Sequence, residues 1–259
     1  MNSTALITGA SKGLGLELAK VFASSSYDLV LVARSESLLK SIQSDLIQRF
    51  GIRVEILVQD LSLPEGPKQT YSFVEKLGLE IEVLVNNAGF GEYGPAWEIP
   101  FEREEEMVQL NIQALIKLTR LFLPGMLERK RGSILNMASM AGFLSGPGMA
   151  VYFATKAFVV CYSEAVAMEL QGTGVTVTAY CPGPIRTGFE KTANLEGTRL
   201  FWLIPVAEAK PVAHRAYQAL KKKKILAIDG LLNETLVFSM RLCPRWLVRL
   251  VMVYILGKR

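Results

Sequence analysis

The chain has 259 residues and a net charge of +5; it is 50% hydrophobic and holds one histidine and three cysteines. Its length and apolar content exclude a disordered chain and predict a single domain over residues 1–259. One histidine and an odd number of cysteines do not support a zinc site, a disulfide framework or a serine hydrolase triad, so no metal is expected. The positive charge suits anionic ligands, but no nucleic-acid-binding motif accompanies it, so no nucleic-acid partner is expected.

Apolar runs typical of buried strands alternate along the chain with helical patterns. Strands are predicted at 3–8, 28–33, 53–58, 82–85, 132–137, 175–180 and 225–228. Helices are predicted at 13–25, 36–50, 65–77, 101–127 and 149–170. This alternation indicates βαβ units with right-handed crossovers. We therefore expect an α/β fold: a single-domain Rossmann fold whose doubly wound, mostly parallel sheet of about seven strands has helices on both faces.

A glycine-rich turn joins the first predicted strand to the first predicted helix. Its glycines permit a tight turn and a close backbone approach, and the N-terminus of the helix can hold a pyrophosphate. A glycine triplet alone is weak evidence, but this one has the strand–turn–helix context that dinucleotide binding requires. The turn is therefore predicted to bind the cofactor through Gly9, Ser11, Lys12, Gly13, Leu14 and Gly15.

The second strand is followed by Arg34, at the place where the adenosine ribose would be recognised. An acidic residue here would bind the 2′-hydroxyl of NAD, but the run Ala33-Arg34-Ser35 holds no carboxylate. Arg34 could instead pair with a 2′-phosphate, and Lys12 could add a second positive charge. This pattern favours NADP(H) as the cofactor; the alternative is that Arg34 is simply solvated.

Tyr152 and Lys156 lie four residues apart in a predicted helix, so both side chains can face one side of it. A free tyrosine has a pKa of about 10, which is too high for easy proton exchange near neutral pH. The positive charge of Lys156 would lower the pKa of Tyr152. Tyr152 could then donate a proton in ketone reduction and accept one in alcohol oxidation.

Together the motifs resemble those of the short-chain dehydrogenase/reductase family. The matching pieces are Thr8 to Gly15, Asp60, Asn86 to Gly89, Asn111, Ser139, Tyr152 with Lys156, and Pro182 to Thr187. Each piece is weak alone, but their order and spacing from residue 3 to about 190 are highly specific. The resemblance implies that Ser139 holds the substrate oxygen and that Lys156 also contacts the nicotinamide ribose. It implies further that Asn111 binds a water in a proton relay through Lys156.

The resemblance also implies cofactor contacts outside the glycine turn. Asp60 would approach the adenine, and Leu61 would line its pocket. Asn87 would be mainly structural, in a run that shapes the cofactor floor, and Ile185 and Thr187 would meet the nicotinamide carboxamide. The predicted contacts are Arg34, Asp60, Leu61, Asn87, Ala88, Gly89, Tyr152, Lys156, Pro182, Gly183, Ile185 and Thr187.

Beyond the core at 1–187 the motifs end. Residues 188–205 are apolar and fall where such enzymes usually carry a substrate lid. They make an acyl chain or a steroid-like ketone a plausible substrate, although ordinary packing of a lid helix would explain them equally well. Residues 231–259 form an apolar and basic extension that is too short and too interrupted to span a bilayer. It could lie in a membrane interface, cover the pocket or pack on another subunit.

The chain is thus expected to be an NADP-dependent oxidoreductase that interconverts a small-molecule carbonyl and a secondary alcohol. The alternatives are a noncatalytic NADP-binding sensor and another reaction of the family, such as epimerisation. A homodimer or homotetramer through the helices at 101–127 and 149–170 is expected by analogy. No cationic leader precedes the first strand, so a cytoplasmic location is expected, with membrane association left open.

Overall fold

The computed structural model describes residues 2–258; Met1, Arg259 and the side chain of Arg241 lie outside the description. Its centre is a seven-stranded parallel sheet in the order β3-β2-β1-β4-β5-β6-β9. The strands are β1 (Thr4–Thr8), β2 (Asp28–Ala33), β3 (Val54–Val58), β4 (Ile81–Asn86), β5 (Gly132–Met137), β6 (Val175–Cys181) and β9 (Leu226–Ile228). Each predicted strand is present, with its ends displaced by one residue at most, and the predicted Rossmann fold is confirmed.

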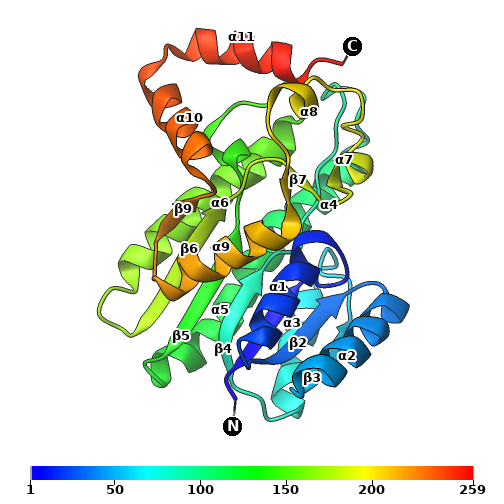
Figure 1. Cartoon of the computed structure of the whole chain (residues 1–259), viewed down its shortest axis with the longest axis vertical. Coiled ribbons are helices and arrows are strands. Elements are labelled where there is room, and N and C mark those ends of the chain that lie inside the picture. Colours follow the sequence, from blue (N-terminus) through cyan, green and yellow to red (C-terminus); the bar gives the residue numbers. More distant parts are fainter. Residues whose placement is uncertain (1, 259) are drawn as a thin grey trace.

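Helices cover both faces of this sheet (Figure 1). They are α1 (Gly13–Ser24), α2 (Glu36–Phe50), α3 (Gly66–Lys76), α4 (Phe101–Val108), α5 (Leu115–Glu128), α6 (Ala150–Glu169) and α9 (Ala209–Lys221). One core lies under α1, α2 and α9, where the Phe22 ring meets Tyr217 edge-on at 5.0 Å. A second core lies under α3, α5 and the end of α6. Burial on both faces explains why the strands read as continuous apolar runs.

The predicted helix at 101–127 is not continuous. Residues Gln109–Ala114 form a π-helical turn between α4 and α5, and Asn111 lies within it. The apolar pattern continues through this segment, so periodicity alone predicted one unbroken helix. Single π-helical turns are rare and occur mostly at functional sites.

Among residues 2–258, α6 is the one helix whose length and composition would allow it to cross a bilayer. That indication is weak, because α6 contributes to the core and packs against β6. Phe153, Val159 and Val160 of this helix are buried inside the protein.

After β6 the chain forms the region above the sheet edge. It holds a small second sheet of β7 (Ile185–Arg186) and β8 (Ala207–Glu208), and the short helices α7 (Phe189–Thr192) and α8 (Leu200–Leu203). The extension folds into α10 (Leu231–Leu242) and α11 (Arg245–Leu256), which lie at the end of the molecule away from the N-terminus (Figure 1). The Tyr93 hydroxyl donates a 2.7 Å hydrogen bond to the carbonyl of Leu256. The backbone amide of Arg199 donates a hydrogen bond to the carbonyl of Gly257. These bonds hold the end of α11 against the loop after β4 and against Arg199, next to α8.

Candidate active site

A cavity of about 390 Å³ opens at the carboxyl edge of the sheet. It lies where β1 and β4 are neighbours and the strand order reverses, which is where ligands bind in open α/β sheets. Fifteen predicted site residues line it: Gly9, Lys12, Gly13, Leu14, Gly15, Asn87, Ala88, Gly89, Ser139, Tyr152, Lys156, Pro182, Gly183, Ile185 and Thr187. The fold thus brings together motifs that are far apart in the sequence.

The geometry of the glycine turn fits a dinucleotide. Gly9 and Gly13 have φ values of 66° and 53°, a left-handed conformation that favours glycine. A Cβ at Gly15 would overlap the carbonyl oxygen of Gly9, so this position requires glycine as well. No side chain caps the N-terminus of α1 at Lys12. The first amides of that helix, with the positive end of its dipole, are suited to hold a pyrophosphate.

The end of β4 holds this turn in place. The Thr8 hydroxyl donates to the carbonyl of Val85 and accepts 3.0 Å hydrogen bonds from the amides of Asn87 and Ala88. The side-chain amide of Asn87 donates to the carbonyl of Thr8 at 2.9 Å. This contact ties the end of β4 to the glycine turn; the role expected for Asn87 stays a prediction.

Arg34 and Asp60 lie beside the cavity, at the ends of β2 and β3. The side chain of Arg34 is 67% exposed, and its Nη1 lies 3.5 Å from Asp60 Oδ2 and 3.6 Å from Glu106 Oε1. Burial raises the pKa of Asp60, but hydrogen bonds from Ser62 together with Arg34 outweigh it, so the pKa is lowered overall. Asp60 is thus an anion that holds Arg34 at the edge of the site.

Five predicted residues do not line the cavity: Ser11, Arg34, Asp60, Leu61 and Asn111. Leu61 is 5% exposed and belongs to the hydrophobic core under α3 and α5. Its predicted contact with the adenine stays a prediction.

Ser139 is positioned by a short 3₁₀ turn, Met140–Phe143, that follows β5. Its hydroxyl oxygen caps this turn by accepting a hydrogen bond from the amide of Ala141 at 3.1 Å. A Cβ at Gly142 would lie 2.8 Å from the carbonyl oxygen of Lys156, so glycine lets the turn pack directly on α6. This close packing brings Ser139 to the residues of α6 that face the cavity.

Tyr152 and Lys156 lie one turn apart on α6, as the sequence predicts. Lys156 is 8% exposed; its Nζ donates a 2.8 Å hydrogen bond to the carbonyl of Met137 and lies 5.8 Å from the centre of the Tyr152 ring. The ring of Phe189, from the lid, lies 5.4 Å from that of Tyr152. The phenol therefore sits between the end of β5 and the lid.

The electrostatics of this pair differ from the prediction. Burial raises the pKa of Tyr152 to about 12, and a hydrogen bond with Ser139 acts in the opposite direction. Burial lowers the pKa of Lys156 to about 8. The predicted lowering of the Tyr152 pKa by Lys156 is therefore wrong, because loss of water dominates and the ammonium donates its hydrogen bond to Met137.

Asn111 is held behind the cavity by the π-helical turn. Its side-chain amide accepts from the amide of Phe90 at 3.1 Å and donates to the carbonyl of Phe90 and the hydroxyl of Thr155 at 2.9 and 3.1 Å. It also borders Gly89, where a Cβ would lie 2.9 Å from Asn111 Oδ1 and 3.7 Å from Lys156 Nζ. Asn111 thus shapes the backbone beside Lys156, and its water relay stays a prediction.

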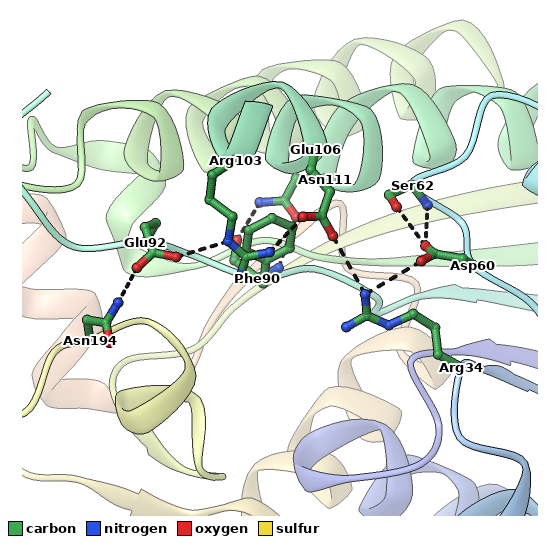
Figure 2. A network of polar contacts seen from close by, with 9 residues as sticks. All are labelled: Arg34, Asp60, Ser62, Phe90, Glu92, Arg103, Glu106, Asn111 and Asn194. Atoms are coloured by element: carbon green, nitrogen blue, oxygen red, sulfur yellow. Dashed lines mark hydrogen bonds and ion pairs between the residues drawn. The ribbon is translucent and has the colours of Figure 1, made fainter. Parts of the chain in front are cut away.

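Sequence reasoning missed a network that joins the Arg34 side of the site to the lid (Figure 2). Arg103 donates to Glu106 at 2.6 Å and to Glu92 at 3.0 Å, and Asn194 of the lid donates to Glu92. Glu106 in turn lies beside Arg34. Arg103 also lies over the Phe90 ring, 4.1 Å from its centre. An arginine within an acidic helix start was the available signal, but the sequence does not show its partners.

The far wall of the cavity is mostly apolar, although Glu190 and Thr192 also line it, and much of it comes from the end of the chain. Its apolar residues are Leu144, Met149 and Phe153 near α6, Phe189, Leu195, Leu200, Phe201 and Ile204 of the lid region, Leu236 and Met240 of α10, and Met252, Ile255 and Leu256 of α11. Of the placements left open for the extension, the structure shows that it covers the pocket.

The model of the short chain dehydrogenase family matches residues 3–197, and the chain belongs to that family. A very-long-chain 3-oxoacyl-CoA reductase of Phaeosphaeria nodorum is 36% identical over 191 residues, which are 72% of this chain and 56% of that protein. The chain spans about half the length of this relative. The ketoacyl reductase HetN of Nostoc sp. is 32% identical over 233 residues, 85% of this chain and 76% of that protein.

Among solved structures, the fold is similar to that of a short-chain dehydrogenase from Sphingobium yanoikuyae in complex with NADPH. The TM-score is 0.83 at 31% sequence identity, and the match covers 93% of this chain and 94% of that one.

Proposed function

We propose that the protein is an NADP(H)-dependent reductase that interconverts a ketone and a secondary alcohol on an apolar substrate, such as an acyl chain or a steroid-like ketone. One observation carries this proposal: a single cavity joins the glycine turn, the group of Ser139, Tyr152 and Lys156, and a wall of lid and extension side chains that is apolar except for Glu190 and Thr192. Cofactor, acid and an apolar substrate would thus meet in one space.

NADP(H) is proposed as the cofactor because Arg34 lies at the end of β2 with an exposed guanidinium that can pair with a 2′-phosphate. The Sphingobium yanoikuyae relative supports this choice, because its structure was solved in complex with NADPH. When bound, the cofactor would supply the hydride that reduces the carbonyl carbon.

Residues of the chain would bind and protonate the substrate oxygen. The Ser139 hydroxyl would donate a hydrogen bond to the carbonyl oxygen, and the Tyr152 hydroxyl would give it a proton as the alcohol forms. At neutral pH the Tyr152 hydroxyl is protonated, as a proton donor in reduction must be. Lys156, as a cation, would contact the nicotinamide ribose and stabilise the negative charge that remains on Tyr152.

An acyl chain is favoured by the relatives as well as by the cavity. Both the Phaeosphaeria nodorum and the Nostoc sp. proteins are named as ketoacyl reductases. We propose a core at residues 1–187, a lid at about 188–205 and an extension at 231–259, with the last two setting substrate choice. Exposed apolar side chains at Phe101 and Met168 support a dimer interface through α4, α5 and α6. The cytoplasmic location stays a prediction.

The test uses the purified full chain and follows NADPH oxidation with 3-oxoacyl thioesters of increasing chain length. Ile255, which lines the cavity, is changed to Trp, and the exposed Val253 of the same helix is changed to Trp as the control. Ile255→Trp should lower kcat/KM for the longest thioester by roughly tenfold and spare the shortest, because it fills the apolar end. No turnover of any thioester, aldehyde or ketone by the wild type would refute the proposed reaction.

A further inference from the structure

The outer sides of α10 and α11 carry a dense group of exposed apolar side chains, which we call the tail surface. It consists of Leu231, Leu232, Phe238 and Leu242 of α10, and Trp246, Leu247, Leu250, Val251, Val253 and Tyr254 of α11. Phe238 is 64% exposed, Leu242 75% and Leu250 60%. Single exposed apolar residues are ordinary on a protein surface, but a group of this size on two consecutive helices marks an interaction site.

Packing within the chain does not explain these residues. On the inner sides of the two helices, Val237 of α10 and Met252 and Leu256 of α11 are already buried. Met252 and Leu256 belong to the hydrophobic cluster that also contains Ala193 and Leu195. Trp246, Leu250 and Val253 follow the i, i+4, i+7 spacing and lie on one outer face. Figure 1 shows α11 lying across the end of the molecule, with α8 beside it. One side of α11 packs against the rest of the protein, whereas the other side is exposed although it is also apolar.

The charges of α11 are of one sign. Arg245 and Arg249 are exposed, and the segment Arg245–Leu256 contains no acidic residue. Trp246 and Tyr254 add amphipathic rings, which are enriched where a protein meets the headgroup level of a membrane. α10 adds one exposed acid, Glu234, but the α11 part of the surface is complementary to a layer that is apolar inside and anionic at its edge.

We propose that the tail surface docks on an anionic lipid bilayer, with α11 lying in the plane of the headgroups. At 1.5 Å per residue, the 12 residues of α11 extend about 18 Å, too short to cross an apolar layer of about 30 Å. A basic helix with an apolar face instead binds at the surface. A second copy of the chain is the less complementary occupant, because a two-fold axis through α11 would bring together the arginines of both copies on a helix without acidic residues.

Docking would also place the cavity next to the bilayer. Leu236 and Met240 of α10 and Ile255 of α11 line the cavity, while neighbouring residues of the same helices form the tail surface. A lipophilic carbonyl compound could then pass from the bilayer to Tyr152 without crossing water. This route rests on the proposed function, whereas docking itself does not.

The test measures co-sedimentation of the full chain with vesicles, without turnover. One set of vesicles contains phosphatidylcholine only, and the other contains phosphatidylcholine mixed with anionic phosphatidylglycerol. The wild type should bind the anionic set more tightly, and added salt should weaken that binding. Leu250→Glu should weaken it at least tenfold, and Arg249→Gln should weaken it about fivefold on anionic vesicles only.

Leu63→Glu is the matched control, because Leu63 is 57% exposed between β3 and α3, away from the tail surface. It should bind vesicles like the wild type. Phe238→Glu on α10 provides a second test variant if thermal unfolding shows that Leu250→Glu does not fold.

Three results would overturn the docking proposal. The first is that the wild type binds neither set of vesicles, and the second is that the folded glutamate variants bind vesicles as tightly as the wild type does. The third is that the wild type binds no vesicles but self-associates, and that the glutamate variants abolish this self-association. The last result would assign the tail surface to a second copy. The vesicle test uses no substrate, so it is independent of the NADPH oxidation test. Failure of vesicle binding would refute the docking proposal alone, and failure of NADPH oxidation would refute the proposed reaction alone.

Discussion

The Nζ of Lys156 donates a 2.8 Å hydrogen bond to the carbonyl of Met137, the last residue of β5. This bond fixes the ammonium beside the end of β5, where both residues line the cavity. Lys156 is nevertheless buried, and burial lowers its pKa to about 8. The charge of Lys156 is therefore sensitive to pH in a range that kinetics can reach.

The first prediction concerns this titration. Lys156 is a cation below its pKa and neutral above it, so contact with the ribose weakens as pH rises through about 8. Tyr152 stays protonated over the same range. We expect kcat/KM for NADPH, which reports the free enzyme, to fall as pH rises through about 8. A pH profile that stays flat through this value would contradict the role of the Lys156 cation.

The second prediction concerns Arg34 and the 2′-phosphate. Loss of a charge-assisted contact of about 1.5–3 kcal/mol in Arg34→Ala should raise KM for NADPH by roughly 10- to 100-fold and leave KM for NADH almost unchanged. Arg49→Ala, which removes an exposed arginine paired with Asp45 on α2, controls for net charge. An unchanged preference for NADPH in Arg34→Ala would remove Arg34 from cofactor recognition.

The third prediction concerns Asn111 and stability. Asn111→Ala leaves the backbone groups of Phe90 and the hydroxyl of Thr155 without their buried partner. We expect the free energy of unfolding in urea to fall by about 2–4 kcal/mol. Asn2→Ala, which removes one exposed hydrogen bond to Asp28, should change it by less than about 0.5 kcal/mol. Equal effects of the two substitutions would show that Asn111 does not support the π-helical turn.

The fourth prediction concerns the contact between Glu92 and the lid. Glu92 accepts from both Arg103 and Asn194, so Glu92→Gln should loosen residues 188–205 over the cavity (Figure 2). KM for a long-chain substrate should rise about threefold to tenfold, with a smaller change in kcat, since a partly buried ion pair contributes about 1 kcal/mol. The exposed Glu98, changed to Gln, serves as the control. A lower kcat at constant KM would instead place Glu92 in the chemical step.

Much of the fold could be predicted because strands buried on both faces differ clearly from amphipathic helices. Residues 28–33 and 132–137 were predicted with the bounds that β2 and β5 have. The π-helical turn at Gln109–Ala114 could not be predicted, because the apolar pattern continues through it. The extension at 231–259 could be recognised in the sequence, but the cavity that its helix α10 lines could not.

In the candidate site, too, some features could be predicted from the sequence and others could not. Tyr152 and Lys156 were predicted from type and spacing and Ser139 from the family resemblance, and the structure places all three around one cavity. Their electrostatics could not be predicted, because the pKa of Tyr152 depends on how completely folding removes water. Partners such as Glu92 and Asn194 are 102 residues apart, and no local pattern relates them.

The central claim is that Tyr152 gives the proton in NADPH-linked carbonyl reduction. The most direct test compares Tyr152→Phe with the wild type by NADPH oxidation on a 3-oxoacyl thioester and, separately, by the dissociation constant for NADPH. The predicted result is a loss of turnover of roughly 10²- to 10⁴-fold, because the acid is gone, with NADPH binding almost unchanged. Near-normal turnover by a folded Tyr152→Phe that still binds NADPH would contradict the claim.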